Sequence, residues 1–192
     1  MTRATMLSTA GPVLPVGLAG TWDDARICCP SAVRRDDGQV VLWYAGQSKG
    51  EERATWSIGL ATSMDGLAFT KHAANPVLGE GQLEEFDGRG VSEPEVAWDQ
   101  RSQMYRMWYT AHAFLGDQSL GHAASSDGVS WQKYPQNPVV TQDLVGLELI
   151  GSPAVLADEG ELRMSIHGRQ PGSRKLSIDE VRNLGQEVVA AP

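Results

Sequence analysis

One segment of this chain occurs twice. Residues 57–78 and 119–140 align at an offset of 119 − 57 = 62, with ten identical residues in 22 aligned positions. The identities keep their order and include a Ser-x-Asp-Gly element and an Asn-Pro-Val element. A period of about 60 residues indicates a repeat architecture, in which each copy is one supersecondary unit that packs on its neighbours.

The repeat extends on both sides of this segment. The other matched elements are Trp43-Tyr44 with Trp108-Tyr109, Pro30 with Pro94, and Trp22-Asp23 with Phe86-Asp87. A weaker third copy begins at Pro153, and Gly11-Pro12-Val13-Leu14 resembles the Asn-Pro-Val element. The repeated Trp and Tyr residues are expected to fill the space between neighbouring sheets.

Each copy is predicted to form four short strands. In the first copy they span 31–35, 39–45, 56–63 and 67–72, with Asp-Gly turns after residues 36 and 64. Four antiparallel strands make the blade of a β-propeller. The fold class is therefore all-β, with a single domain of about three propeller-type blades, at 30–78, 92–140 and 153–190. An N-terminal strand, 11–14, would complete a blade. Residues 177–184 are the one helix-like stretch.

Three blades are too few to close a ring, because propellers have about four to eight. Open blade edges would expose unpaired strands. We expect two copies to associate into one ring as a homodimer, with 11–14 completing the partner's last blade. The alternatives are that the chain is a fragment of a longer protein or an open three-blade body capped by loops.

Composition excludes several classes of partner. The chain has 16 basic and 24 acidic residues, a net charge of −8, so nucleic acid and anionic membrane surfaces are not expected partners. No apolar run reaches the roughly 18 residues that a membrane span needs, and 1–11 lack the pattern of a secretory signal. Cys28 and Cys29 are too few for a metal site and fit a reducing compartment. The expected location is the cytoplasm.

Four elements of the first copy together resemble a known family. They are Pro-Ser-Ala-Val (30–33), Leu-Trp-Tyr-Ala-Gly (42–46), Ile-Gly-Leu-Ala-Thr-Ser-Met-Asp-Gly (58–66) and Asn-Pro-Val-Leu (75–78). Their succession resembles the five-bladed propeller glycoside hydrolases of families 43 and 32, over about residues 11–170. The resemblance implies activity on a carbohydrate, such as an arabinoside, xyloside or fructoside, without a cofactor. Some relatives hold calcium on the propeller axis, but no residues here require it.

The resemblance also implies two catalytic carboxyl groups, an acid and a base or nucleophile. The family places its general-acid Glu beside the Pro that opens an inner strand, and Glu93 in Ser-Glu-Pro matches that pattern. The equivalent residues in the other copies are Cys29 and Ser152, so the repeat itself does not require an acid there. The family's base is an Asp in Asp-Pro, which this chain lacks. Asp23 or Asp24 is the candidate substitute, although the repeat mate Asp87 indicates that Asp23 is structural.

Polar residues at the ends of the second strands are candidates for substrate binding. Gln47, His112 and Arg169 occupy equivalent positions, and His167 stands two residues before Arg169. Propeller pockets are lined by corresponding loops of each blade, so these side chains would donate hydrogen bonds to sugar hydroxyls or a carboxylate. Trp22 could stack on a sugar face. No zinc spacing and no phosphate-binding loop is present, so no metal site is predicted.

We therefore interpret the chain as a glycoside-hydrolase-like protein that acts on oligosaccharides or plant-type glycans by carboxylate acid/base chemistry. The alternative is a non-catalytic carbohydrate-binding or interaction module that kept the blade and lost the catalytic pair. The missing Asp-Pro favours the alternative, whereas Glu93 and the two histidines favour the enzyme.

Overall fold

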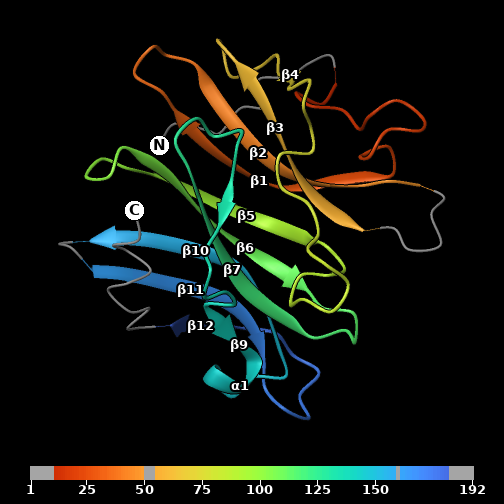
Figure 1. The fold of residues 1–192 in the computed structure, drawn as a ribbon, viewed down its shortest axis with the longest axis vertical. Helices are drawn as coiled ribbons and strands as arrows, with labels where there is room; N and C mark the ends of the chain where they lie inside the picture. Colours follow the sequence, from red (N-terminus) through yellow and green to blue (C-terminus); the bar gives the residue numbers. More distant parts are fainter. Residues whose placement is uncertain (1–10, 50–54, 159–160, 182–192) are drawn as a thin grey trace, which may run out of the picture.

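The computed structural model describes residues 11–49, 55–158 and 161–181 of the 192-residue chain. These residues form three antiparallel sheets in chain order, and their one helix, α1 (Gln142–Val145), is a single turn. Each sheet packs against the next along the chain, as Figure 1 shows from the red and orange first sheet to the blue third sheet. The predicted all-β fold of propeller-type blades is confirmed. No helix among the described residues is long and apolar enough to cross a membrane.

The first two blades have four strands in sequential order. The strands of the first blade are β1 (Arg26–Arg34), β2 (Val40–Gln47), β3 (Trp56–Ser63) and β4 (Thr70–Lys71). Those of the second are β5 (Val91–Asp99), β6 (Met104–His112), β7 (Gln118–Ser125) and β8 (Gln132–Lys133), with β9 (Val140–Thr141) also pairing with β7. The third blade is described as β10 (Leu149–Asp158), β11 (Glu161–Arg169) and β12 (Ser177–Val181).

The prediction of a helix over 177–184 is wrong for its first five residues. Ser177–Val181 pairs with β11 from Gly168↔Ser177 to Met164↔Val181. Pairing with β11 satisfies the backbone N–H and C=O groups of this segment, and Val181 is buried, so tertiary context decides over local propensity. Residues 182–184 lie outside the described residues.

The first strand of every blade carries a β-bulge at the same place. In β5 the register shifts between Ser92 and Glu95, and β1 and β10 shift at the equivalent positions. In each bulge the residue before the proline has a positive φ: 55° at Cys29, 52° at Glu93 and 47° at Ser152. Positive φ is unfavourable for a residue with a Cβ, and a bulge redirects a side chain. The repeat thus redirects one side chain in each blade. These side chains lie at the same end of the first strands, which pack together because β5 contacts both β1 and β10.

The repeated Asp-Gly element is a structural turn. Asp65 Oδ1 accepts hydrogen bonds from the N–H groups of Leu67 and Ala68, at 2.8 and 2.9 Å. These backbone bonds lower the pKa of Asp65 to about 2. Asp127 makes the same bonds in the second blade, and its pKa is lowered to about 2 for the same reason.

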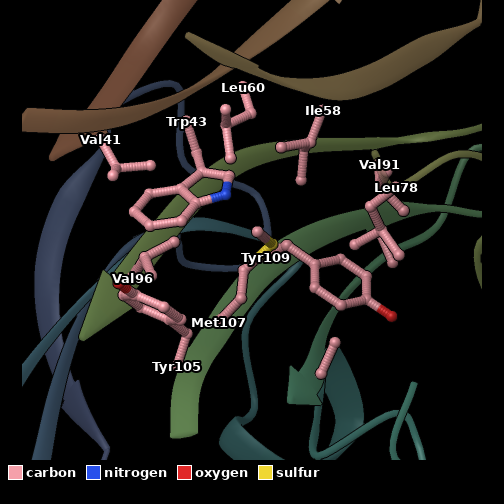
Figure 2. Packing of buried hydrophobic residues seen from close by; sticks show 12 residues of the cluster. Val41, Trp43, Ile58, Leu60, Leu78, Val91, Val96, Tyr105, Met107 and Tyr109 are labelled. Atoms are coloured by element: carbon pink, nitrogen blue, oxygen red, sulfur yellow. The ribbon is translucent and has the colours of Figure 1, made fainter. Parts of the chain in front are cut away.

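Two apolar layers hold the blades together. Between the first and second blades, Trp43 packs against Tyr105 (Figure 2). Its Nε1 donates to the Gly128 carbonyl at 2.9 Å. The residues that meet Trp108 between the second and third blades are Leu120, Val140, Leu147, Ile150, Met164, Ile166 and Val181. Trp43, Tyr109 and Trp108 therefore fill the inter-blade space, as predicted. Tyr44 instead lies in a separate apolar cluster of the first blade, with Leu14 and Ala61.

The segment 11–14 lies against the first blade. The Val13 carbonyl accepts from the Phe69 N–H at 3.4 Å, and Leu14 is buried with Tyr44 and Ala61. It forms no strand here. A single domain with blades at 30–78, 92–140 and 153–190 remains our proposal, and residues 159–160 and 182–190 of the last blade lie outside the described residues.

Candidate functional site

The Glu93 carboxylate is fixed between the second and third blades. The Thr110 hydroxyl on β6 donates to Glu93 Oε2 at 2.7 Å, and the Ser152 N–H on β10 donates to the same oxygen at 2.7 Å. Both donors come from bulge or strand-end positions that the repeat sets. The half-buried Glu93 is therefore held in one orientation at the end of the inner strands.

The side chains of His167 and Glu93 both lie next to Gly151. A Cβ added to Gly151 would lie 2.8 Å from Glu93 Oε2 and 2.9 Å from His167 Cε1. Real Cβ atoms do not come so close, so any larger residue at 151 would displace the carboxylate or the imidazole. The absence of a side chain at 151 lets the two functional groups converge from different blades.

His112 lies beside the same group. Its Nε2 is 2.8 Å from Ser92 Oγ, and its Nδ1 is 3.4 Å from Gln118 Nε2. Burial lowers the pKa of His112, Glu93 opposes this by attraction, and Arg89 adds to it by repulsion. His112 is therefore a neutral imidazole at neutral pH, and it is close enough to Glu93 to sense the charge of the carboxylate.

Two thiols occupy the equivalent end of β1. The Cys29 thiol donates to Cys28 Sγ at 2.9 Å, and both cysteines are free. Burial, and then the neighbouring Cys28 and Glu93, raise the pKa of Cys29 to about 12. A protonated thiol thus stands where the second blade has a carboxylate.

Sequence reasoning missed Glu95, which joins the first strands of all three blades. Glu95 Oε2 lies 3.5 Å from Ser31 Oγ on β1, and its Oε1 lies 3.5 Å from the Val155 N–H on β10. Burial raises the pKa of Glu95. The signal was present in the sequence, because Glu95 follows Glu93-Pro94 and its equivalents Ser31 and Ala154 carry no charge.

Asp23 belongs to a buried cluster that both complete repeats share. Asp23, which is 1% exposed, accepts from Lys71 Nζ at 2.6 Å and from the Tyr44 hydroxyl at 3.0 Å. Its repeat mate Asp87 pairs with Lys133 at 2.7 Å. This agrees with the structural role that the repeat indicated, and no contact between Asp23 and Glu93 is found among the described residues. A catalytic role for Asp23 stays a prediction.

Asp24 holds a loop together. Its carboxylate accepts from the N–H groups of Gly20 at 2.8 Å and Lys49 at 2.6 Å. These two backbone bonds lower its pKa. Its catalytic role also stays a prediction.

The other predicted binding residues are spread around the blades. Trp22 packs on Tyr44 with ring centroids 5.5 Å apart, and a Cβ at Gly46 would lie 2.4 Å from its ring, so Trp22 covers the first blade. Arg169 forms an ion pair with Glu148 at 3.2 Å, and Gln47 pairs with Arg26 in the strand register. The structure thus brings His167 and His112 to Glu93. Over 11–49, 55–158 and 161–181 no cluster of three or more His, Cys, Asp or Glu residues suits a metal ion.

Comparison with known proteins identifies the family. Residues 13–133 match the family described as the glycosyl hydrolases family 32 N-terminal domain. The chain belongs to this family. It is 32% identical to an uncharacterized protein, MT1551, of Mycobacterium tuberculosis (strain CDC 1551 / Oshkosh) over 170 residues, which are 81% of this chain and 52% of that protein. This member of glycosyl hydrolase family 32 therefore spans about half the length of the curated protein that it matches.

Solved structures show the same fold. A family 117 glycoside hydrolase of Zobellia galactanivorans, Zg3597, superposes with a TM-score of 0.68 at 13% identity, over 88% of this chain and 46% of that chain. The Bombyx mori family 32 beta-fructofuranosidase BmSUC1 gives a TM-score of 0.61 at 16% identity, over 80% of this chain and 33% of that chain. At these identities the similarity shows that this family 32 chain has the propeller fold of the glycosidases, and it shows the fold alone.

Proposed function

We propose that the chain acts on oligosaccharides, plant-type glycans included, by carboxylate acid/base chemistry, with Glu93 as the general acid. The observation that carries the proposal is the oriented Glu93 carboxylate in the β5 bulge, fixed by Thr110 and Ser152. Among the three equivalent bulge residues, only Glu93 has a carboxyl group. Family membership supports a glycosidase-like site and gives no support to the non-catalytic alternative.

Glycoside hydrolysis needs a second carboxyl group. We assign this role to Glu95, which follows on the same strand and whose pKa burial raises. A carboxylate with a raised pKa is a stronger base, so it is better suited to activate a water molecule. Asp23 and Asp24, the candidates from sequence, are bound in ion-pair and backbone contacts and serve as comparison variants.

In this proposal Glu93 transfers a proton to the glycosidic oxygen as the bond to the anomeric carbon breaks. Glu95 takes a proton from the water that attacks that carbon. His112 and His167 lie beside Glu93 and would donate hydrogen bonds to sugar hydroxyls. Gln47, Arg169 and Trp22 are assigned to substrate binding farther from the reacting bond.

The relatives' names suggest which substrates to try first. One structural relative is a beta-fructofuranosidase and another a family 117 glycoside hydrolase. Fructosides therefore come first in the screen, followed by the arabinosides and xylosides that the sequence resemblance implies. The partner in this proposal is carbohydrate, and the chain's net charge of −8 argues against nucleic acid.

The test is turnover of that screen by wild type, E93Q and E84Q. Glu84 is exposed, so E84Q controls for the loss of one charge. We expect E93Q to lose about 10²- to 10⁴-fold in kcat, as removal of a general acid does, and to keep the circular dichroism spectrum of wild type. Equal turnover by E93Q and E84Q would contradict the assignment. So would a wild type that binds the sugars without cleaving them.

A further inference from the structure

A pocket lies on the second blade, away from Glu93. It has a volume of about 300 Å³ and is lined by residues of β6, β7 and the β8 region, Arg106, His122, Lys133 and Tyr134 among them. Arg106 stands near the start of β6, whereas Thr110 and His112 of the candidate site stand near its end. No acidic side chain is found among the described residues that line the pocket.

Two buried polar side chains of this pocket have unpaired donors. Arg106 is 4% exposed, and its Nη2 makes only long contacts, 3.5 Å to Asp99 Oδ2 and 3.3 Å to Ser102 Oγ. Its Nε and Nη1 have no hydrogen-bond partner within the part of the chain that is described. His122 is 1% exposed, and both of its ring nitrogens lack a partner there. Buried donors without partners are unfavourable, so such groups commonly mark a ligand or ion site.

The repeat does not require polar residues at these positions. In the first blade Trp43 pairs with Leu60, and in the second Trp108 pairs with His122, so Leu60 and His122 are equivalent. Two residues before each tryptophan stand Val41 and Arg106. Val41 and Leu60 are buried in the apolar core of the first blade. The second blade therefore has a guanidinium and an imidazole where the first blade has two apolar side chains.

We propose that this pocket binds an oxyanion, a carboxylate or a phosphate group, between the guanidinium of Arg106 and the imidazole of His122. The N–H groups on Nε and Nη1 of Arg106 have no partner among the described residues, so they can donate charge-assisted hydrogen bonds to oxygens of the anion. The ring of Trp108 lies 5.3 Å from that of His122 and fixes its orientation. Burial and the charge of Arg106 lower the pKa of His122 to about 4, so the neutral ring offers one N–H donor.

The test uses the full chain and the anions alone. Thermal unfolding and titration calorimetry would be run with sodium phosphate and with sodium acetate, against sodium chloride at matched ionic strength. The variants are R106V and H122L, which introduce the residues of the first blade, and R101Q, which removes an exposed arginine of the same blade. We expect a saturable rise in Tm in wild type and R101Q. In R106V the affinity for the anion should fall about tenfold or more, because at least one charge-assisted hydrogen bond is lost.

The two anions distinguish the ligand classes. A response to phosphate alone would indicate a phosphorylated ligand, and a response to acetate alone would indicate a carboxylate ligand. R106V and H122L should each keep or raise the Tm without anion, because an apolar side chain replaces a buried polar one. If R106V does not fold, the C–H resonances of His122, assigned by their loss in H122L, should shift on adding anion to wild type. Equal binding by wild type and R106V, or no saturable binding and no shift of His122, would overturn the proposal. None of these readouts depends on glycosidase activity.

Discussion

The hydroxyl of Thr110 donates a 2.7 Å hydrogen bond to the carboxylate of Glu93, across from the strand bulge that carries the glutamate. The first blade has Ala45 at the position of Thr110 and Cys29 at the position of Glu93. The hydroxyl and the carboxylate therefore both occur in the second blade, where the first blade has neither.

Replacing Thr110 by Val should remove this bond while keeping the side-chain shape. We expect T110V to lower the free energy of unfolding by about 1–3 kcal/mol, since Thr110 is buried and its acceptor is an ionisable group. Urea denaturation of T110V measures this. T62V, at a half-buried strand threonine of the first blade, is the control, and an equal loss in both variants would contradict a specific bond to Glu93.

Gly151 should be intolerant of even a methyl group. In G151A the new Cβ would lie 2.8 Å from Glu93 Oε2, so the carboxylate or His167 must move, and the cost should be about 1–3 kcal/mol of unfolding free energy. G79A is the matched control, because a Cβ there would meet its nearest atom at 3.9 Å. A G151A variant as stable as G79A would show that the two groups do not converge there.

The Asp23–Lys71 pair should matter for stability. Asp23 is buried, so D23N should cost about 2–4 kcal/mol, somewhat less than a fully buried pair because the Lys71 side chain is 26% exposed. D87N, which breaks the equivalent pair with Lys133, should cost a similar amount. Denaturation of both variants gives the comparison. A D23N variant with unchanged stability and abolished turnover would instead make Asp23 catalytic.

Cys29 should resist thiol reagents until high pH. With a pKa of about 12 in place of 9.0, its thiolate fraction at pH 8 is about a thousandfold lower than that of an ordinary thiol, and reactivity should appear only as pH rises toward 12. The exposed Cys28, measured alone in the variant C29S, serves as the comparison. In the variant C28S, burial and Glu93 still raise the pKa of Cys29, so Cys29 should react slowly with a disulfide reagent at pH 8, and faster after unfolding in urea. Rapid reaction of folded C28S would refute the buried, protonated thiol.

Closure of the ring by a second copy remains a proposal about assembly. Light scattering should then give a mass of twice 20.7 kDa for the purified chain. A monomer would contradict closure by self-association. In that case the edges of the first and third blades stay open or are covered by another segment.

The sequence predicted the blades because the repeat preserves turns and inter-blade aromatics. Asp65 and Asp127 occupy the same turn, and Trp43 and Trp108 lie in successive apolar layers. These features depend on local patterns that recur, so one sequence contains enough copies to show them. The family resemblance placed Glu93 beside the proline that opens an inner strand, and Glu93 lies near the start of β5.

The remaining features depend on contacts that the repeat does not encode. Glu95 was missed because its partners Ser31 and Val155 come from two other blades. The strand 177–181 was predicted as helix because its pairing with β11 is not visible locally. Arg106 and His122 were not predicted as a pair, because the repeat is recognised by the residues that its copies share and the first two copies differ at these two positions.

The central claim, that Glu93 is the general acid, is tested most directly by varying the leaving group. E93Q would be compared with wild type on glycosides whose leaving groups range from an alkyl alcohol to an acidic phenol. A general acid is needed least when the leaving group departs as a stable anion. The account predicts that E93Q loses about 10²- to 10⁴-fold in kcat on the alkyl glycoside and far less on the glycoside of the acidic phenol. An equal loss on both substrates would contradict the assignment of Glu93 as the acid.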